Sequence, residues 1–242
     1  MKSLGTYLLF VGSLFKKMES FGTYVKRTLD ESILIGINSL VLVTIVSTFI
    51  GMVTTVQTAA NLVSPFIQDF VISTVVRDMT VFELAPTITS IVLAGKVGSN
   101  IAGELGTMRI TEQVDALEVM GINSASYLVL PKILGAMLMF PMLVVLSGFL
   151  SIYGGYLIGT LTSIMSGEDY IYGLRFDFKQ YNIFIALVKS LVFAFLVSSI
   201  SAYKGYYTKG GALEVGQAST SAVTNSCIAI LLADYLVVEI LV

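Results

Sequence analysis

The stretch SILIGINSLVLVTIVSTFIGMVTTVQTAANLVSPFIQ (Ser32–Gln68) contains 37 residues and no Asp, Glu, Lys or Arg. Two further charge-free runs follow, at Ile133–Gly167 with 35 residues and at Val215–Ala233 with 19 residues. A bilayer core about 30 Å thick is crossed by a helix of roughly 20 apolar residues. The whole chain is 12% charged, against roughly 25% in soluble domains. These features predict an all-α integral membrane protein rather than a soluble domain with large buried helices.

Five segments within one domain have the length and apolarity of membrane spans, and they cover residues 36–60, 84–108, 131–161, 180–203 and 220–242. The first charge-free run exceeds one span, so its end through Pro65 must leave the bilayer core or bend. The second span has small residues three and four positions apart, namely Ala94, Gly95, Gly98, Ser99, Ala102, Gly103 and Gly106. Because small residues let helices approach closely in lipid, we expect the second span at the centre of the bundle.

Polar and glycine-rich stretches predict the connections between the spans. Asp69, Arg77 and Asp78 mark a return to water after the first span. The second span is then expected to begin near Pro86, because proline is tolerated in a first helical turn. A glycine-rich stretch that starts at Tyr203 predicts a loop before the fifth span.

The N-terminal residues have an apolar pattern of helical period, formed by Leu4, Tyr7, Leu8, Val11, Phe15 and Met18. A secretory signal peptide is the alternative, but Lys16 and Lys17 follow directly and no small-residue cleavage site is visible. An amphipathic segment at residues 21–31 comes next. We therefore expect residues 1–31 to form an interfacial helix region that lies along the membrane surface.

Basic residues are distributed unevenly around the predicted spans, and the more basic side of a membrane protein is normally cytoplasmic. On the side of the N-terminus lie nine, namely Lys2, Lys16, Lys17, Lys26, Arg27, Arg109, Lys132, Lys204 and Lys209. Three lie on the other side, Arg77, Arg175 and Lys179, and two fall within spans, Lys96 and Lys189. The N-terminus and residues 111–130 are predicted to be cytoplasmic, and the C-terminus is predicted to be outside.

A polar segment, TEQVDALEVMGINSASYLVLPKI (Thr111–Ile133), interrupts the apolar sequence near its middle. Thr111 is a suitable N-cap, Glu112 puts a negative charge in the first turn, and Gly121 is a natural stop after the last turn. The predicted helix at 111–121 is too short to be stable without packing. One side of this helix is apolar, with Ala116, Val119 and Met120, and the other side is acidic, with Glu112, Asp115 and Glu118. The residues alone leave open whether it is a solvated loop or a docking element.

Three polar residues inside the second span, Lys96, Asn100 and Glu104, are spaced to share one helix face. Charges within a membrane normally face protein or a water-filled cavity. They predict a polar path or gate for lipid headgroups, or an ionic latch between Lys96 and Glu104, and both alternatives stay open. Glu83 at the outer end of this span is a candidate for the same path, or a solvated helix start.

Three charges lie in the last two predicted spans, Lys189, Asp234 and Glu239. Lys189 is expected to extend its ammonium to the membrane interface. Asp234 and Glu239 are expected to lie at the outer interface.

Several chemistries are excluded by composition. The chain has no histidine, and its one cysteine, Cys227, allows neither an internal disulfide nor a cysteine-based metal site. The Gly-Lys pair in AGKVGS does not form a phosphate-binding loop, because Ser90 stands where that motif needs glycine and Val97 where it needs Ser or Thr. We expect no catalytic residue, bound metal, cofactor or nucleic-acid partner for this chain.

Two long stretches resemble the MlaE-type permeases of ABC transporters: FELAPTITSIVLAGKVGSNIAGELGTMRITEQVDALEVMGI (Phe82–Ile122) and GYYTKGGALEVGQASTSAVTNSCIAILLADY (Gly205–Tyr235). The resemblance covers Val81–Tyr235, and it departs from the family pattern at Lys96, where arginine is common, and Ala85, where glycine is common. In that family the polar segment is the cytoplasmic coupling helix. The resemblance assigns this role to Thr111, Glu112, Asp115, Ala116, Glu118 and Gly121.

The resemblance also implies a function and partners. It implies the membrane-spanning subunit of a lipid transporter in a bacterial inner membrane, which moves phospholipid or a related hydrophobic molecule. The implied partners are two ATPase subunits that use ATP and Mg²⁺, a second copy of this chain, and an MCE-domain protein on the outer side. An ion-coupled secondary transporter or channel is the alternative, motivated by Lys96 and Glu104. An intramembrane enzyme is disfavoured by the missing catalytic groups.

Overall fold

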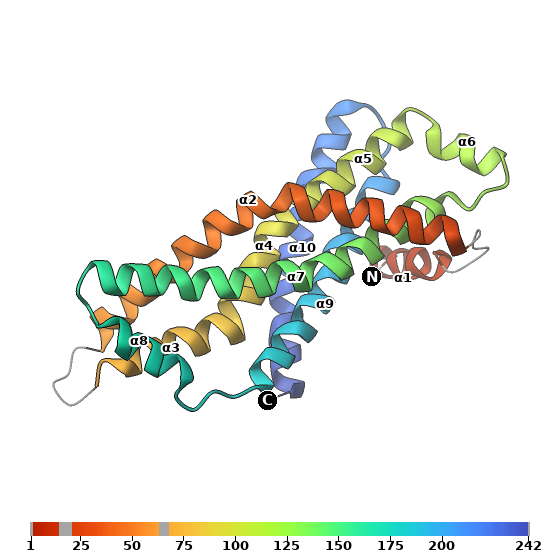
Figure 1. Cartoon of the computed structure of the whole chain (residues 1–242). Helices are drawn as coiled ribbons and strands as arrows, with labels where there is room; N and C mark the ends of the chain where they lie inside the picture. Colours follow the sequence, from red (N-terminus) through yellow and green to blue (C-terminus); the bar gives the residue numbers. More distant parts are fainter. Residues whose placement is uncertain (1, 15–20, 63–67, 242) are drawn as a thin grey trace.

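The protein is a helical bundle in the computed structural model, which describes residues 2–14, 21–62 and 68–241 (Figure 1). Five helical segments are long and apolar enough to cross a membrane, which confirms the predicted fold class and number of spans. The elements are α1 (Lys2–Ser13), α2 (Phe21–Asn61), α3 (Phe70–Met79), η1 (Thr80–Ile88), α4 (Thr89–Leu93), η2 (Ala94–Gly98), α5 (Ser99–Ile110), α6 (Gln113–Val119), α7 (Ser124–Leu161), α8 (Gly167–Arg175), α9 (Tyr181–Tyr206) and α10 (Ala212–Leu241).

Four spans begin earlier than predicted, the first, second, third and fifth. The segment 21–31 is the first part of α2 and not of the interfacial region. The third span starts at Ser124 instead of Pro131, because the Asn123 side chain caps it by accepting a hydrogen bond from the Ser126 amide. Most of the loop that was predicted to start at Tyr203 is helical, since α9 continues to Tyr206 and α10 starts at Ala212. Glycine does not break a helix that packs along its length.

The second span is a path of 41 residues, Phe70–Ile110, made of α3, η1, α4, η2 and α5. The prediction that Arg77 marks a return to water is wrong, whereas the Asp78 side chain is 48% exposed. Arg77 is 2% exposed, its Nη2 lies 2.8 Å from Asp78 Oδ1, and its Nη1 donates to the carbonyl oxygens of Leu174 and Phe176. These partners compensate the charge, so the helix continues through it.

The helices α2 and α7 lie side by side along most of their length (Figure 1). Their contact depends on glycine. A Cβ on Gly51 would overlap the Ser151 carbonyl group, and a Cβ on Gly154 would overlap the Thr48 carbonyl group. Such small residues let two helix backbones touch in a membrane.

The second span is at the centre of the bundle, as predicted from its small residues. Its segments contact α2, α7, α9 and α10. A close approach is found between α5 and α9, where a Cβ on Gly205 would lie 2.5 Å from the Ala102 carbonyl oxygen. These contacts place α9 against the same small-residue face that the sequence predicts for helix packing.

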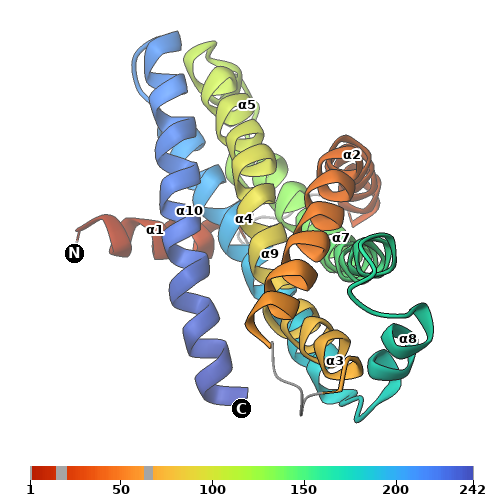
Figure 2. The same ribbon diagram turned by 90° about the vertical axis from the view of Figure 1, so that its left-hand side faces the viewer.

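The bundle has two ends, which we call the near end and the far end. The near end carries α6 and α1; α1 lies across the bundle (Figure 2), and its Phe10 ring is 5.7 Å from that of Tyr203 on α9. The far end carries α8 and the C-terminal part of α10, where the Tyr181 hydroxyl donates to the Leu241 carbonyl. The two termini therefore lie at opposite ends. Phe15, Lys16, Lys17, Met18 and Pro65, on which parts of the prediction rested, lie outside the described residues.

At the far end, α8 is attached to the spans through Tyr170, which is completely buried. Its hydroxyl donates to the Ile152 carbonyl oxygen over 3.0 Å. Burial raises the pKa of Tyr170 to about 12, and a hydrogen bond with Thr55 opposes that shift in part. The hydroxyl therefore keeps its proton at neutral pH and acts as a fixed donor.

Candidate coupling helix and buried charge clusters

The polar segment forms the short helix α6, and its end was predicted correctly. Gly121 has a φ of +81°, and its amide donates to the Glu118 carbonyl while the Ile122 amide donates to that of Leu117. This pair of bonds is the Schellman arrangement that stops a helix. The predicted N-cap is wrong: Glu112 precedes the helix with a φ of 60°, and the Thr111 hydroxyl instead donates to the Thr107 carbonyl of α5.

Part of α6 faces the bundle and part projects beyond it (Figure 1). Val114 is fully buried, whereas Val119 and Met120 are 88% and 65% exposed. Glu112 and Ala116 are also exposed. An apolar pair at the tip of a polar, projecting helix is typical of a contact with another protein.

Two acidic residues of α6 are bound by the bundle. Asp115 forms an ion pair of 2.6 Å with Arg109 at the end of α5. Glu118 accepts hydrogen bonds from Ser124, the first residue of α7, and from Tyr206, the last residue of α9, over 2.9 and 3.1 Å. Both acids were predicted as docking residues, and no sequence pattern indicated these internal partners.

A buried ion cluster lies toward the near end between α2, α5 and α7. The Lys132 ammonium is 2.6 Å from Glu31 Oε1 and 2.7 Å from Glu104 Oε2, and the lysine side chain is 3% exposed. The predicted latch between Lys96 and Glu104 is therefore wrong, because Glu104 pairs with Lys132. Lys132 was counted among the cytoplasmic charges because the third span was expected to start at Pro131, one residue before it.

Lys96, Asn100 and Glu104 do share one helix face, as predicted. All three line a small crevice of about 20 Å³ against α2. Lys96 donates a hydrogen bond to the Asn38 carbonyl of α2, and in the described part of the chain it forms no ion pair with a carboxylate. The role of these residues in a lipid path stays a prediction.

A second buried cluster lies toward the far end between η1, α9 and α10. The Lys189 ammonium, fully buried, is 2.7 Å from Glu83 Oε2 and 2.8 Å from Asp234 Oδ1. It also donates to the Phe82 carbonyl oxygen over 3.2 Å. The expectations that Lys189 reaches the membrane interface and that Asp234 is merely interfacial are wrong. A lysine in the fourth predicted span and an acid in the fifth could have indicated such a pair, but each was interpreted as an interfacial charge.

Two charged residues of the second span lie in π-helical segments. Glu83 is in η1 and Lys96 is in η2. A π segment in an α-helix is frequently associated with a functional site. Pro86 within η1 lacks an amide proton, which favours an irregular hydrogen-bond pattern there, but η2 contains no proline that would have indicated it.

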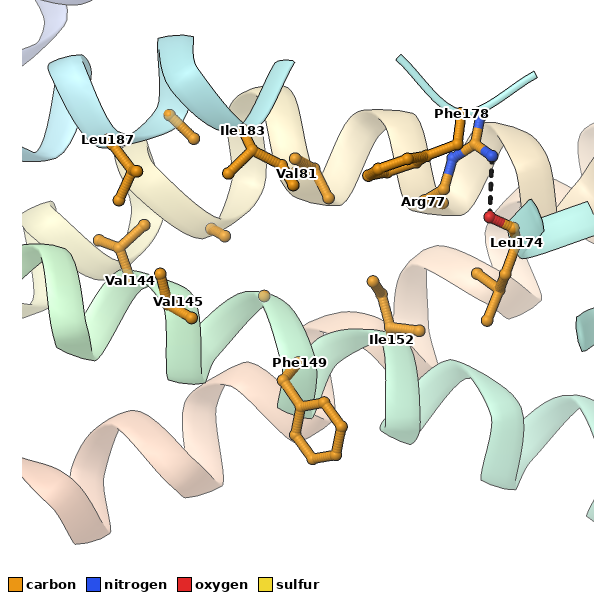
Figure 3. A pocket seen from close by; sticks show the side chains of 13 residues that line it. Arg77, Val81, Val144, Val145, Phe149, Ile152, Leu174, Phe178, Ile183 and Leu187 are labelled. Atoms are coloured by element: carbon orange, nitrogen blue, oxygen red, sulfur yellow. Dashed lines mark hydrogen bonds between the residues drawn. The ribbon is translucent and has the colours of Figure 1, made fainter. Parts of the chain in front are cut away.

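A largely apolar cavity of about 280 Å³, partly open to its surroundings, lies between η1, α7 and α9 (Figure 3). Its walls include Val81, Phe149 and Ile183. Arg77 closes one end, where its side chain bonds to Leu174 and lies 5.4 Å from the Phe178 ring. The volume is just below the range of roughly 300–1,000 Å³ that is usual for ligand pockets. The sequence did not predict this cavity, because its walls come from three separate spans.

The ion cluster around Lys132 leads to a testable expectation about pairing. Lys132→Met and Glu104→Gln are each expected to lower the stability of the protein. The loss in the double variant is expected to be smaller than the sum of the two single losses, because the double variant removes both partners of the ion pair. Lys96→Gln and Glu104→Gln are expected to be additive. Thermal unfolding of the purified protein measures both cycles, and strong coupling of the second pair with none in the first would contradict the described pairing.

Comparisons with known proteins agree with this architecture. Residues 28–240 match the sequence model of the family described as permease MlaE. A probable ABC transporter permease protein of Rickettsia bellii is 36% identical over 99% of this chain and 92% of its own length. One of Synechocystis is 34% identical over 87% of the chain and 80% of its length. The chloroplastic protein TRIGALACTOSYLDIACYLGLYCEROL 1 of Arabidopsis thaliana is 33% identical over 87% of this chain and 60% of its own length. The chain therefore belongs to the MlaE permease family and is a multi-pass membrane permease subunit.

Proposed function

We propose that this permease moves phospholipid or a related hydrophobic molecule and is driven by a separate ATPase subunit. The complex would contain two copies of this chain, two ATPase subunits that bind ATP and Mg²⁺, and an MCE-domain protein on the outer side. The observation that carries the proposal is α6, a short capped helix whose exposed apolar tip lies outside the spans. Because the sequence lacks a phosphate-binding loop, ATP-driven transport by this chain would need a separate ATPase chain, and α6 is the element that we assign to its docking.

Two observations support a lipid as the substrate. The cavity between η1, α7 and α9 is nearly free of polar surface and lies within three spans, so an acyl chain matches its chemistry. In addition, the Arabidopsis thaliana relative carries the name of a glycolipid. The polar face of Lys96, Asn100 and Glu104, with Glu83 beyond it, would then guide or gate the headgroup.

The proposed orientation places the near end in the cytoplasm of a bacterium and the C-terminus outside its inner membrane. Lys132 and Arg77 are buried in helices and no longer count as loop charges, which leaves eight basic residues on the near side and two on the far side. That asymmetry still favours a cytoplasmic near end. It puts α6 in the compartment that contains ATP.

The docking role of α6 is tested by giving its tip a charge. The double variant Val119→Asp and Met120→Asp is expected to fold normally, because both side chains are exposed, but to lose at least tenfold in ATPase copurification. Gly121→Val is expected to weaken binding as well, since a β-branched residue is strained at a φ of +81°. Pull-down from native membranes, followed by the rate of ATP hydrolysis in liposomes, measures both effects.

The matched control is Ile171→Asp with Tyr172→Asp, an exposed apolar pair on α8 at the opposite end. It is expected to leave ATPase binding unchanged. If the α6 variant copurifies with the ATPase and transports lipid like the parent, α6 is only a loop. Lipid or ion movement by the purified chain without any ATPase would instead support a secondary transporter or channel.

A further inference from the structure

The contact that links α6 to the spans is a cluster of three side chains. Glu118 of α6 accepts a hydrogen bond of 3.1 Å from the Tyr206 hydroxyl and one of 2.9 Å from the Ser124 hydroxyl. The two hydroxyl oxygens are themselves 2.7 Å apart. One carboxylate of the coupling helix is thereby bonded to the first residue of α7 and the last residue of α9.

The ring of Tyr206 is held in a fixed position by aromatic neighbours. Its centroid is 5.3 Å from that of Phe10, which is 1% exposed, and 5.3 Å from that of Tyr207. The Arg109 guanidinium lies 5.9 Å from the same ring. Aromatic pairs at these separations are favourable and restrict the ring. Displacement of Glu118 therefore acts on the backbone of α9 and not only on a mobile side chain.

The helix α9 reaches from this contact to the cluster at the far end. It is continuous from Tyr181 to Tyr206, and Lys189 lies about 26 Å from Tyr206 along the helix axis. At the near end Gly205 packs directly on Ala102, so α9 has little freedom to bend there. At the far end Lys189 is bonded to Glu83 of η1 and Asp234 of α10.

We infer that Tyr206 is a positioning residue that transmits displacement of α6 to α9, and through Lys189 to η1 and α10. This inference rests on the proposed function, and it adds the route by which the ATPase acts on the far end. The far part of α9 also lines the apolar cavity, through Ile183 and Leu187 (Figure 3). Movement of α9 as a rigid body would change the width of that cavity.

The test removes the hydrogen bonds of Tyr206 and keeps its packing. Tyr206→Phe is expected to retain ATPase copurification, thermal stability and ATP hydrolysis within twofold of the parent. Lipid transport by the reconstituted complex is expected to fall at least fivefold, so that more ATP is hydrolysed for each lipid moved. Glu118→Gln is expected to reduce transport similarly, and the double variant is expected to be no worse than either single one.

The matched control is Tyr203→Phe, one turn earlier on α9, whose hydroxyl is 2.7 Å from that of Thr6. It is expected to behave like the parent in every measurement. Equal transport by the two variants would overturn the inference, as would loss of ATPase copurification in Tyr206→Phe, because Tyr206 would then act on docking alone. A parent complex that neither hydrolyses ATP nor moves lipid would refute the proposed function itself, which is a different result.

A second measurement follows the far end directly. In a Cys227→Ser background, Ile183→Cys places a thiol on α9 beside the cavity, at a position that is 41% exposed. Its rate of labelling is expected to change at least twofold when ATP is added, to become independent of ATP with Tyr206→Phe, and to remain responsive with Tyr203→Phe. If the labelling rate of Ile183→Cys does not change with ATP when Tyr206 is intact, α9 does not move, and this result contradicts the inference.

Discussion

Lys189→Met is expected to destabilise the protein by about 3 kcal/mol, the lower end of the usual cost of removing one partner of a buried ion pair, because the Glu83 side chain left behind is 42% exposed. The lysine side chain is completely buried, and its ammonium is within 2.8 Å of two carboxylates that belong to different helices. Without it, Glu83 and Asp234 face each other with no cation between them, so η1 and α10 are expected to separate. Thermal unfolding and the amount of protein extracted from membranes measure the loss.

Removal of all three charges distinguishes a structural role from a functional one. Lys189→Met combined with Glu83→Gln and Asp234→Asn leaves no unpaired ion, so most of the stability is expected to return while lipid transport stays impaired. Lys209→Met, at an exposed position near the start of α10, serves as the control and is expected to have no effect. A single Lys189 variant as stable as the parent would show that the cluster does not hold these helices together.

Gly51→Ala is expected to destabilise the contact between α2 and α7 by about 3 kcal/mol or more, at the upper end of what overpacking costs. A Cβ at this position would overlap a backbone carbonyl group, which cannot move aside as a side chain can. Gly154→Ala meets the equivalent obstacle on α7, against the Thr48 carbonyl group. The double variant is expected not to accumulate as folded protein, which size-exclusion chromatography of detergent extracts detects.

The same substitution at open positions provides the control. Among the described residues, a Cβ on Gly95 or Gly216 would meet nothing within 4 Å beyond the backbone of its own helix. Alanine at either position is expected to be neutral or to stabilise the helix by up to about 1 kcal/mol. Destabilisation of equal size at Gly95, Gly216 and Gly51 would indicate a general intolerance of larger side chains rather than a close contact of backbones.

Sequence patterns that depend on neighbouring residues predicted the structure well. The long apolar segments, three of them largely without charge, indicated the number of spans, because crossing a bilayer mainly requires apolar length. The small residues around Gly98 located the central span, and Gly121 located the end of α6, because each acts through local backbone geometry.

Features that depend on distant partners were predicted poorly. No pattern in the sequence around Lys132 indicates that its partner is Glu31, which lies 101 positions earlier. Arg77 was taken for a loop residue because the carbonyl groups that bind it come from the C-terminal end of α8. The same reason explains the missed cavity and the missed bond between Glu118 and Tyr206, whose members meet only after the helices have packed.

The two π-helical segments decide which faces of the second span carry its charges. Between η1 and η2 lies a short α-helical segment, Thr89–Leu93. A π segment adds a residue to a helical turn, so the residues that follow it are rotated by about 100° around the axis relative to an unbroken α-helix. Glu104 therefore reaches Lys132 on α7, while Glu83 reaches Lys189 on α9, on a face that an uninterrupted helix would orient differently.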